Sequence, residues 1–209
     1  MVTPMNLGLL TDIHEHVEFL KVALERFDSE QIDQVVVIGD LFEMGERIAE
    51  TCRLLEKAAA IGVWGNHDFG LCAEPDAGIR RRYPADVLKF MASLRPRLVV
   101  GDCHFSHVEA WLDAENLTDL WYYEGPPDDR SKLERIFAAV PQRVLFAGHF
   151  HRWLLATPEG ISDWQGSQPV QLDDDERFFV VVGALCQGRY AVFDTETSVL
   201  TPYNEASPT

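Results

Sequence analysis

The stretch NLGLLTDIH, residues 6–14, joins an apolar run to two side chains that can bind metal ions. The run Asn6–Leu10 predicts a buried strand, and Asp12 and His14 follow it directly. In extended backbone, residues two apart project to the same side, so this carboxylate and this imidazole can converge. A single D-x-H is weak evidence, and its meaning depends on what surrounds it.

Residues 17–64 alternate between predicted helices and predicted strands. Val17–Phe27 and Ile48–Ala60 have near-helical apolar spacing, whereas Gln34–Ile38 and Ile61–Trp64 are short apolar runs. Strand, helix, strand, helix and strand in this order predict a parallel sheet with crossover helices.

The remainder of the chain predicts two helices, several strands and one irregular segment. The helices are Pro84–Leu94 and Ser131–Ala139, the second with Ser131 as its cap and Glu134 completing a capping box. The strands are Arg97–Val100 and Cys103–Val108 as a hairpin, then Arg143–Phe146, Trp153–Ala156, Phe178–Val182, Tyr190–Asp194 and Val199–Tyr203. No linker divides the chain, so we predict one domain over residues 1–209.

Residues 111–130 are aromatic and acidic, and we expect them to form a lid or insertion. The aromatic side chains concerned are Trp111, Trp121, Tyr122 and Tyr123. They could stack on an aryl or nucleoside leaving group, or they could form the small core of the lid. The sequence leaves both interpretations open.

Composition excludes several classes of protein. The chain has 209 residues, 46% of them hydrophobic, and a net charge of −16 that disfavours binding to long nucleic acids. No stretch approaches ~18 uncharged apolar residues, so no membrane span is expected. The N-terminus does not resemble a signal peptide, and the four scattered cysteines fit reduced thiols, so we expect a cytoplasmic protein.

Polar residues recur where the predicted strands end. D-x-H, GD, GNHD, a single histidine and GHxH each occur once, in this order along the chain. The residues are Asp12, His14, Asp40, Asn66, His67, Asp68, His107, His149 and His151. Because functional sites of α/β sheets form at the carboxyl ends of strands, the ordered set predicts one shared site.

With these motifs the sequence resembles the calcineurin-like metallophosphoesterases, and within them the small single-domain bacterial and archaeal phosphodiesterases. The resemblance covers about residues 5–195, including VVGALCQGRYAVFD at 181–194 as a variant of a late block. It implies an α/β fold, a two-sheet α-β-β-α sandwich whose mixed sheets pack face to face with helices outside.

The resemblance also implies two metal ions. Asp12, His14 and His151 would hold the first, Asn66, His107 and His149 would hold the second, and Asp40 would bridge them. Nitrogen and oxygen ligands without thiolate suit Mn²⁺, Fe, Zn²⁺ or Ni²⁺, and we expect manganese first. Paired metals can clamp the attacking and leaving oxygens of an in-line displacement.

Charge favours a small phosphorylated substrate. The positive charge of two divalent ions exceeds the negative charge of Asp12, Asp40 and a bridging hydroxide, which leaves a net charge of about +1 at the centre of an acidic protein. Such a hydroxide would be the nucleophile, so the protein itself needs only to protonate the leaving group. His67 is not required as a ligand, and family roles make it the general acid, with Asp68 orienting it.

Two further residues border the predicted site. His16 stands in a run that reads D-I-H-E-H, where relatives often have D-x-H-G-N, and we expect it to border the substrate pocket. Arg189 belongs to the late block, which here has Ala184 in place of the usual serine, and we expect it to support substrate binding. His104, three positions before His107, is expected to be a surface or core histidine.

We therefore expect a metal-dependent phosphoesterase, either a phosphodiesterase or an enzyme of broad specificity. The chain lacks the Asp-Arg-Gly that follows Gly39-Asp40 in protein phosphatases, which disfavours a phosphoprotein or phosphomonoester phosphatase. That phosphatase and a non-catalytic, protein-binding scaffold of the same fold remain as alternatives. The sequence does not specify the natural substrate or the oligomeric state.

Overall fold

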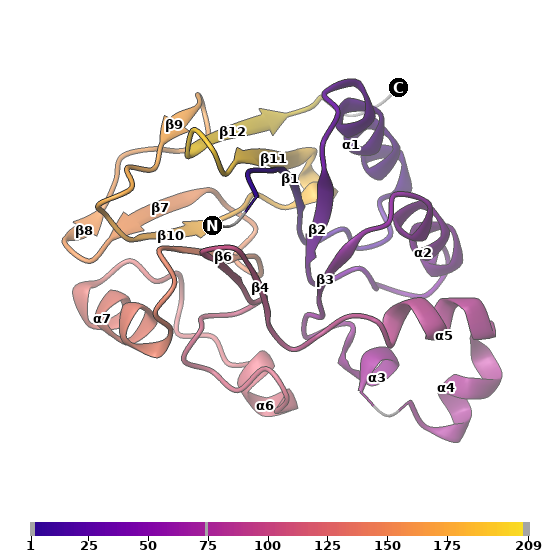
Figure 1. Cartoon of the computed structure of the whole chain (residues 1–209). Helices are drawn as coiled ribbons and strands as arrows, with labels where there is room; N and C mark the ends of the chain where they lie inside the picture. The colour runs from indigo at the N-terminus through magenta and orange to yellow at the C-terminus, as the bar shows by residue number, and fades with distance from the viewer. Residues whose placement is uncertain (1–2, 74, 207–209) are drawn as a thin grey trace.

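The computed structural model describes residues 3–73 and 75–206. Two six-stranded sheets pack face to face and helices cover their outer faces (Figure 1). The predicted α/β sandwich with mixed sheets is therefore confirmed.

The first sheet has the strand order β3-β2-β1-β11-β12-β9. Its members are β1 (Asn6–Leu10), β2 (Gln34–Ile38), β3 (Ile61–Val63), β9 (Val170–Gln171), β11 (Arg189–Asp194) and β12 (Val199–Asn204). The first three strands are mutually parallel, and β11 pairs antiparallel to β1. Because β1, β2 and β3 are parallel, their carboxyl ends lie at one edge of the sheet.

The second sheet has the order β4-β5-β6-β10-β7-β8. Its members are β4 (Leu98–Val100), β5 (Cys103–Phe105), β6 (Val144–Ala147), β7 (Leu154–Thr157), β8 (Gly160–Ile161) and β10 (Phe178–Val181). Strands β4 and β5 form the expected antiparallel hairpin, and β5 runs parallel to β6. The ends of β5 and β6 therefore also share an edge.

Seven α-helices and one short 3-10 helix complete the described chain. They are α1 (Val17–Ser29), α2 (Ile48–Lys57), α3 (Phe69–Cys72), α4 (Ala77–Arg82), α5 (Ala85–Met91), α6 (Leu117–Leu120), α7 (Arg130–Ala139) and η1 (Leu185–Gln187). α7 begins one residue earlier than predicted, because Asp129 rather than Ser131 caps it and accepts the backbone N–H of Lys132 at 3.0 Å.

Alternate side chains of β1 explain how the layers are held together. Leu7 and Leu9 are fully buried between the two sheets, whereas Leu10 packs with the helices of the outer layer. Gly8 faces the same outer layer, where a Cβ would lie 2.7 Å from the ring of Phe27 on α1. Glycine at position 8 therefore allows the close approach of α1. Helix α7 covers the outer face of the second sheet (Figure 1).

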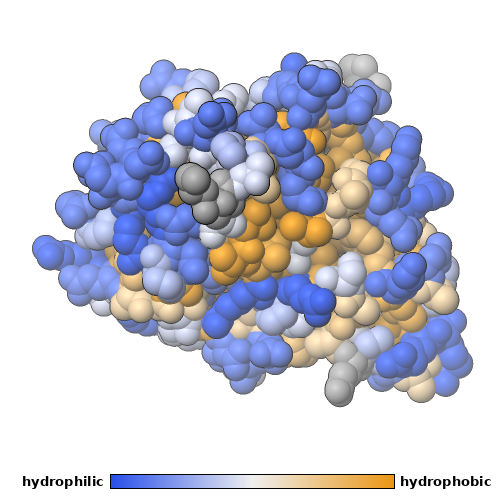
Figure 2. Space-filling view, viewed as in Figure 1, coloured by the Kyte–Doolittle hydropathy of each residue, from blue (hydrophilic) through white to orange (hydrophobic). Residues whose placement is uncertain are grey.

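One face of the molecule exposes apolar side chains (Figure 2). Figure 2 shows apolar side chains gathered in the middle of the visible face, with hydrophilic residues around them. Two apolar side chains of edge strands are exposed: Val99 of β4 is 51% exposed and Ile61 of β3 is 37% exposed. No helix within the two described ranges is long and apolar enough to cross a membrane.

Candidate metal centre

The predicted ligands come together where strands of both sheets end. Asp12 follows β1, Asp40 follows β2, Asn66 follows β3, His107 follows β5 and His149 follows β6. Backbone hydrogen bonds join these loops: Asp12 N–H donates to the Gly39 carbonyl at 3.0 Å, and Gly148 N–H donates to the His107 carbonyl at 3.1 Å. The loops therefore form one cluster rather than separate turns.

Most of these ligands have an unusual backbone conformation. Asp12, His14, Asp40, His149 and His151 have φ between +44° and +68°, in the left-handed region that side-chain-bearing residues rarely adopt. Such conformations cluster at functional sites, where the surrounding structure imposes them. Here they direct side chains from several loops to a common point.

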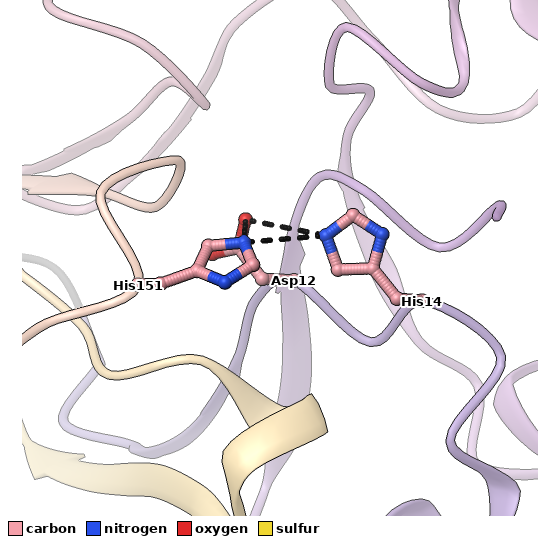
Figure 3. A group of neighbouring side chains, drawn as sticks. All are labelled: Asp12, His14 and His151. Carbon is pink, nitrogen blue, oxygen red and sulfur yellow. Dashed lines mark hydrogen bonds and ion pairs between the residues drawn. The ribbon is translucent and has the colours of Figure 1, made fainter.

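The first predicted ligand group is assembled as expected. Nε2 of His151 lies 3.1 Å from Oδ1 of Asp12 and 3.3 Å from Nε2 of His14. Figure 3 shows the two imidazoles facing each other across the carboxylate, His14 from the loop after β1 and His151 from the loop after β6. One donor atom from each of the three residues lies within 4.8 Å of the others, which is close enough for one metal ion.

The environment of Asp12 fits a metal ligand. The residue is fully buried, and its Oδ2 accepts hydrogen bonds from Thr11 Oγ1 at 2.8 Å and from the backbone N–H of His149 at 3.1 Å. Oδ1 accepts no hydrogen bond of acceptable geometry among the described residues, and its near neighbour is Nε2 of His151 at 3.1 Å. A buried carboxylate oxygen without a partner is costly, and a cation at this point would satisfy it.

The second predicted group meets at the side chain of Asn66. Its Oδ1 lies 3.1 Å from Nε2 of His107 and 3.1 Å from Nδ1 of His149. Nδ1 of His107 donates to the carbonyl of Ile38 at 2.7 Å, because a carbonyl can only accept. In the neutral ring that bond leaves the lone pair on Nε2 of His107, which is directed at the site, as in histidines that bind metals.

Asp40 lies between the two groups. Its Oδ2 is 3.7 Å from Nε2 of His14 and 3.2 Å from Nε2 of His107. Its Oδ1 accepts the backbone N–H of His67 at 3.0 Å. A carboxylate in contact with both groups is in the position that a bridging ligand needs.

The electrostatics of the cluster favour positive charge. Burial alone would raise the pKa of Asp40, but His107, His67 and His14 outweigh it and hold that pKa well below its usual value. Burial alone would lower the pKa of His107, but Asp40 outweighs it and raises that pKa to about 9. Asp40 therefore stays ionised and attracts cationic neighbours, whereas burial and the neighbouring Asp40 raise the pKa of Asp68 to about 7.

His67 and Asp68 are not related as we expected. The Asp68 carboxylate accepts backbone N–H groups from Leu41 and Phe42 at 2.9 Å each, and from Gly65 at 3.0 Å. It thus ties the loop after β3 to the loop after β2, and within the described residues it forms no hydrogen bond or ion pair with the His67 ring. Successive side chains in a turn point in different directions, so a neighbour in sequence is poorly placed to orient an imidazole.

The carboxylate that faces His67 is Glu43. Its Oε2 lies 3.7 Å from Nδ1 of His67 and 2.8 Å from Nδ1 of His14. Sequence reasoning missed Glu43, because nothing in the sequence shows how the loop after β2 folds back over the site. Glu43 can therefore influence both a metal ligand and the predicted proton donor.

Glu15 explains why that loop folds back. Its buried carboxylate accepts three backbone N–H groups, from Glu43 at 3.0 Å, Gly45 at 2.6 Å and Arg47 at 2.6 Å. Glu15 has φ of +58°, at the position where relatives of the D-x-H-G-N type carry glycine. A glutamate at a position where relatives carry glycine is the sequence feature that indicates a special role for residue 15.

The two residues expected to bind substrate lie close to the cluster. His16 is exposed and lines the same cavity as the ligands, while Arg189 Nη1 donates to the carbonyl of His151 at 3.4 Å. Arg189 thus contacts the backbone of a ligand. His104 is a core histidine, 3% exposed, on the β5 strand.

The cluster opens into a cavity of about 500 Å³. Its lining residues are His14, His16, Asp40, Glu43, Asn66, His67, Trp121, His149, His151 and Cys186. Among these described residues there is no lysine or arginine. A phosphate entering the cavity would therefore need positive charge from bound metal ions.

Comparisons with known proteins identify a family and a shared fold. The calcineurin-like phosphoesterase superfamily domain matches residues 5–198. An uncharacterized protein of Methanocaldococcus jannaschii is 23% identical over 213 residues, covering 90% of this chain and 82% of that protein.

Two solved structures show the same fold. A metallophosphoesterase from Sphaerobacter thermophilus superposes with a TM-score of 0.79 at 20% identity, over 98% of this chain and 89% of that one. A structure described as a novel archaeal phosphodiesterase has a TM-score of 0.56 at 16% identity, over 96% of this chain and all of that one (100%). The chain belongs to the calcineurin-like phosphoesterase superfamily, a family of metal-dependent phosphoesterases.

Proposed function

We propose that the protein hydrolyses phosphodiesters at a centre of two metal ions, within a single domain. The observation that supports this most strongly is the position of Asp40, whose Oδ2 lies within 3.7 Å of His14 and 3.2 Å of His107. One ion would be held by Asp12, His14 and His151. The other would be held by Asn66, His107 and His149, with Asp40 shared.

The donor set is consistent with Mn²⁺, and also with Fe, Zn²⁺ or Ni²⁺, because it contains only nitrogen and oxygen. When bound, two such ions would polarise the phosphate ester and activate the attacking water. The residues of this chain would do the rest. The ligands would hold the metal ions that bind the substrate phosphate, and a protein acid has to protonate the departing oxygen.

His67 is the residue best placed to donate that proton. It lines the cavity, its side chain is 28% exposed, and its ring centroid lies 4.9 Å from that of His14. Glu43, rather than Asp68, would orient the ring from Nδ1, which leaves Nε2 to face the leaving group. A general acid of this kind contributes ~10²–10⁴ to the rate.

The cavity favours a diester over a monoester. A phosphodiester carries one negative charge, whereas a phosphomonoester is largely dianionic near neutral pH. The described lining holds the carboxylates of Asp40 and Glu43 and no lysine or arginine, which opposes the second charge. The solved structure named as an archaeal phosphodiesterase is consistent with this assignment, although the likeness is one of fold.

The test is turnover by purified protein loaded with Mn²⁺, with metal content measured by mass spectrometry. We expect hydrolysis of bis-p-nitrophenyl phosphate, with slower hydrolysis of p-nitrophenyl phosphate. Failure on both substrates with metal bound would reject the proposal. Turnover of a phosphopeptide well above that of diesters would support a phosphoprotein phosphatase, and a metal content near zero would support a protein-binding scaffold.

We also propose a cytoplasmic location. The four cysteines, Cys52, Cys72, Cys103 and Cys186, are all free thiols, and burial raises the pKa of Cys52 and of Cys103 to about 12. Buried thiols of this kind are protected from reaction and suit a reducing compartment. The acidic surface, with a net charge of −16, supports a small substrate rather than a long nucleic acid.

A further inference from the structure

Two aromatic side chains beside the metal centre are largely exposed. Trp121 is 54% exposed and Tyr123 is 61% exposed, whereas large aromatic side chains usually bury most of their surface. They belong to residues 111–130, the segment whose aromatic residues had two interpretations. Their exposure excludes a role as the core of that segment.

Both rings are placed against residues of the site. The ring centroid of Trp121 lies 5.2 Å from that of His67, and the ring of Trp121 lines the metal cavity. The ring centroid of Tyr123 lies 5.9 Å from that of His149 and 6.1 Å from that of Phe150. One aromatic ring thus borders the proposed proton donor, and the other borders a metal ligand.

The segment that carries these rings is anchored to the rest of the protein. Asn116 caps α6, and Trp121 follows the last residue of that helix. On the other side, Lys132 Nζ donates to the carbonyl of Glu124 at 2.9 Å, and Arg135 forms an ion pair with Glu124 at 2.8 Å. The rings are therefore held in place while their surfaces remain open.

Tyr122 differs from its two neighbours in what it contacts. Its ring packs edge-on against Trp111 at 5.9 Å, and its hydroxyl bonds the carboxylate of Glu124. Arg135 lies 4.2 Å from the ring of Trp111 on the same side. Tyr122, which is 41% exposed, thus packs on Trp111 within the segment, whereas the rings of Trp121 and Tyr123 lie against His67 and His149 of the site.

The position of Trp121 relates it to the leaving group. A general acid must lie within hydrogen-bond distance of the oxygen that departs. A planar group attached to that oxygen would then lie beside His67, where the indole ring is. Stacking on an aromatic side chain contributes to binding for any planar ring, because the contact uses the ring face.

We propose that Trp121 and Tyr123 form a stacking site for a planar aromatic group, an aryl ring or a nucleobase, that is esterified to the phosphate. This inference rests on the proposed function, since the substrate phosphate has to lie at the metal centre. The site selects phosphodiesters with an aromatic alcohol or nucleoside over aliphatic ones of the same charge.

The experiment measures binding of two monoanionic diesters, diphenyl phosphate and dimethyl phosphate, to the Mn²⁺-loaded protein by calorimetry. We expect diphenyl phosphate to bind at least about 10-fold tighter. Trp121→Ala should reduce that ratio about 5- to 10-fold, Tyr123→Ala should reduce it less, and Trp121→Phe should retain most of it. The matched control is Leu117→Ala, which removes another exposed apolar side chain, 47% exposed, from α6 and should leave the ratio unchanged.

Three results would overturn the stacking site: equal affinity for the two diesters, no detectable binding of either, or an unchanged ratio in Trp121→Ala. Turnover of bis-p-nitrophenyl phosphate is measured in parallel, so that the two proposals can fail separately. Turnover without aromatic preference rejects the stacking site alone. If the protein prefers the aromatic diester through Trp121 but shows no turnover, the proposed hydrolase function is rejected and the stacking site is supported.

Discussion

Glu43 places Oε2 2.8 Å from Nδ1 of His14, on the side of the imidazole that faces away from the other ligands. Carboxylates in this position fix the orientation of metal-binding histidines and make them more basic. Their removal typically lowers metal affinity about 10- to 100-fold. This contact has a direct consequence for metal binding.

Glu43→Gln should weaken binding of Mn²⁺ by about 10- to 100-fold, because the amide keeps the shape but loses the charge that polarises His14. The measurement is a titration of metal-free protein with Mn²⁺. Glu46→Gln is the matched control, since Glu46 is an exposed acid of the same loop that forms no hydrogen bond or ion pair with the ligands among the described residues. Equal affinities in the two variants would contradict the role of Glu43.

His67→Ala should keep its metals and lose about 10²–10⁴ in turnover number. The loss should be larger for a phenyl ester than for a p-nitrophenyl ester, because phenolate is the poorer leaving group and needs the proton more. Metal content is measured together with turnover on both esters. His67 also shares a candidate cluster with His14 and Asp40, so a parallel loss of metal and turnover would identify it as a ligand instead.

Gly65→Ala should disrupt the metal centre without changing any ligand. A Cβ at this position would lie 2.1 Å from Oδ1 of Asp40, so the carboxylate has to move. We expect Mn²⁺ affinity to fall at least about 10-fold in a protein that remains folded by circular dichroism. Gly70→Ala is the control, because its Cβ would meet only Ile79 at 3.6 Å, and normal affinity in Gly65→Ala would refute the expectation.

His104 should make the protein less stable in mild acid. Burial, with a smaller contribution from Arg97, lowers the pKa of His104 to about 4, whereas the unfolded chain has the ordinary value near 6.5. The unfolded state therefore binds more protons between pH 4 and pH 6.5, so the stability from neutral His104 is complete above pH 6.5 and decreases as the pH falls. The expected loss from pH 7 to pH 5 is about 2 kcal/mol.

The measurement is urea unfolding of metal-free wild type and His104→Leu at pH 7 and pH 5. Leucine cannot protonate, so the variant should lose about 2 kcal/mol less than wild type over this interval. His16→Leu, at an exposed histidine, should behave as wild type does. An identical pH dependence in wild type and His104→Leu would show that His104 titrates normally.

The sequence predicted the scaffold, and the side chains that cluster where its strands end, better than the surroundings of that cluster. Asn6–Leu10 and Gln34–Ile38 are strands over the predicted residues, because apolar runs that end in polar residues reflect burial directly. The ligands follow such strands, so topology alone brings them together. Contacts that depend on the path of a loop cannot be predicted in this way. Glu43 lies beside His14 because Glu15 accepts three backbone N–H groups of the loop that carries Glu43.

Sequence proximity was a poor guide to the role of Asp68. Its three bonds are to backbone N–H groups of two loops, one of them 27 residues away in sequence. Likewise, the exposure of Trp121 depends on where α6 lies, and apolar residues of an irregular segment give no periodicity from which to infer it. The fold could be predicted from the order of apolar runs along the sequence, whereas the roles of these side chains depend on tertiary packing.

The left-handed backbone of the ligand loops also governs how mutants at this centre should be read. At Asp12 and Asp40, with φ of +50° and +54°, alanine removes a donor atom and also places a residue that disfavours this conformation, at a cost of roughly 1–2 kcal/mol. Asparagine tolerates it far better. Aspartate-to-asparagine exchanges therefore report on metal binding. Alanine substitutions at the same positions would combine the loss of a metal-binding oxygen with a change in the backbone conformation of the loop.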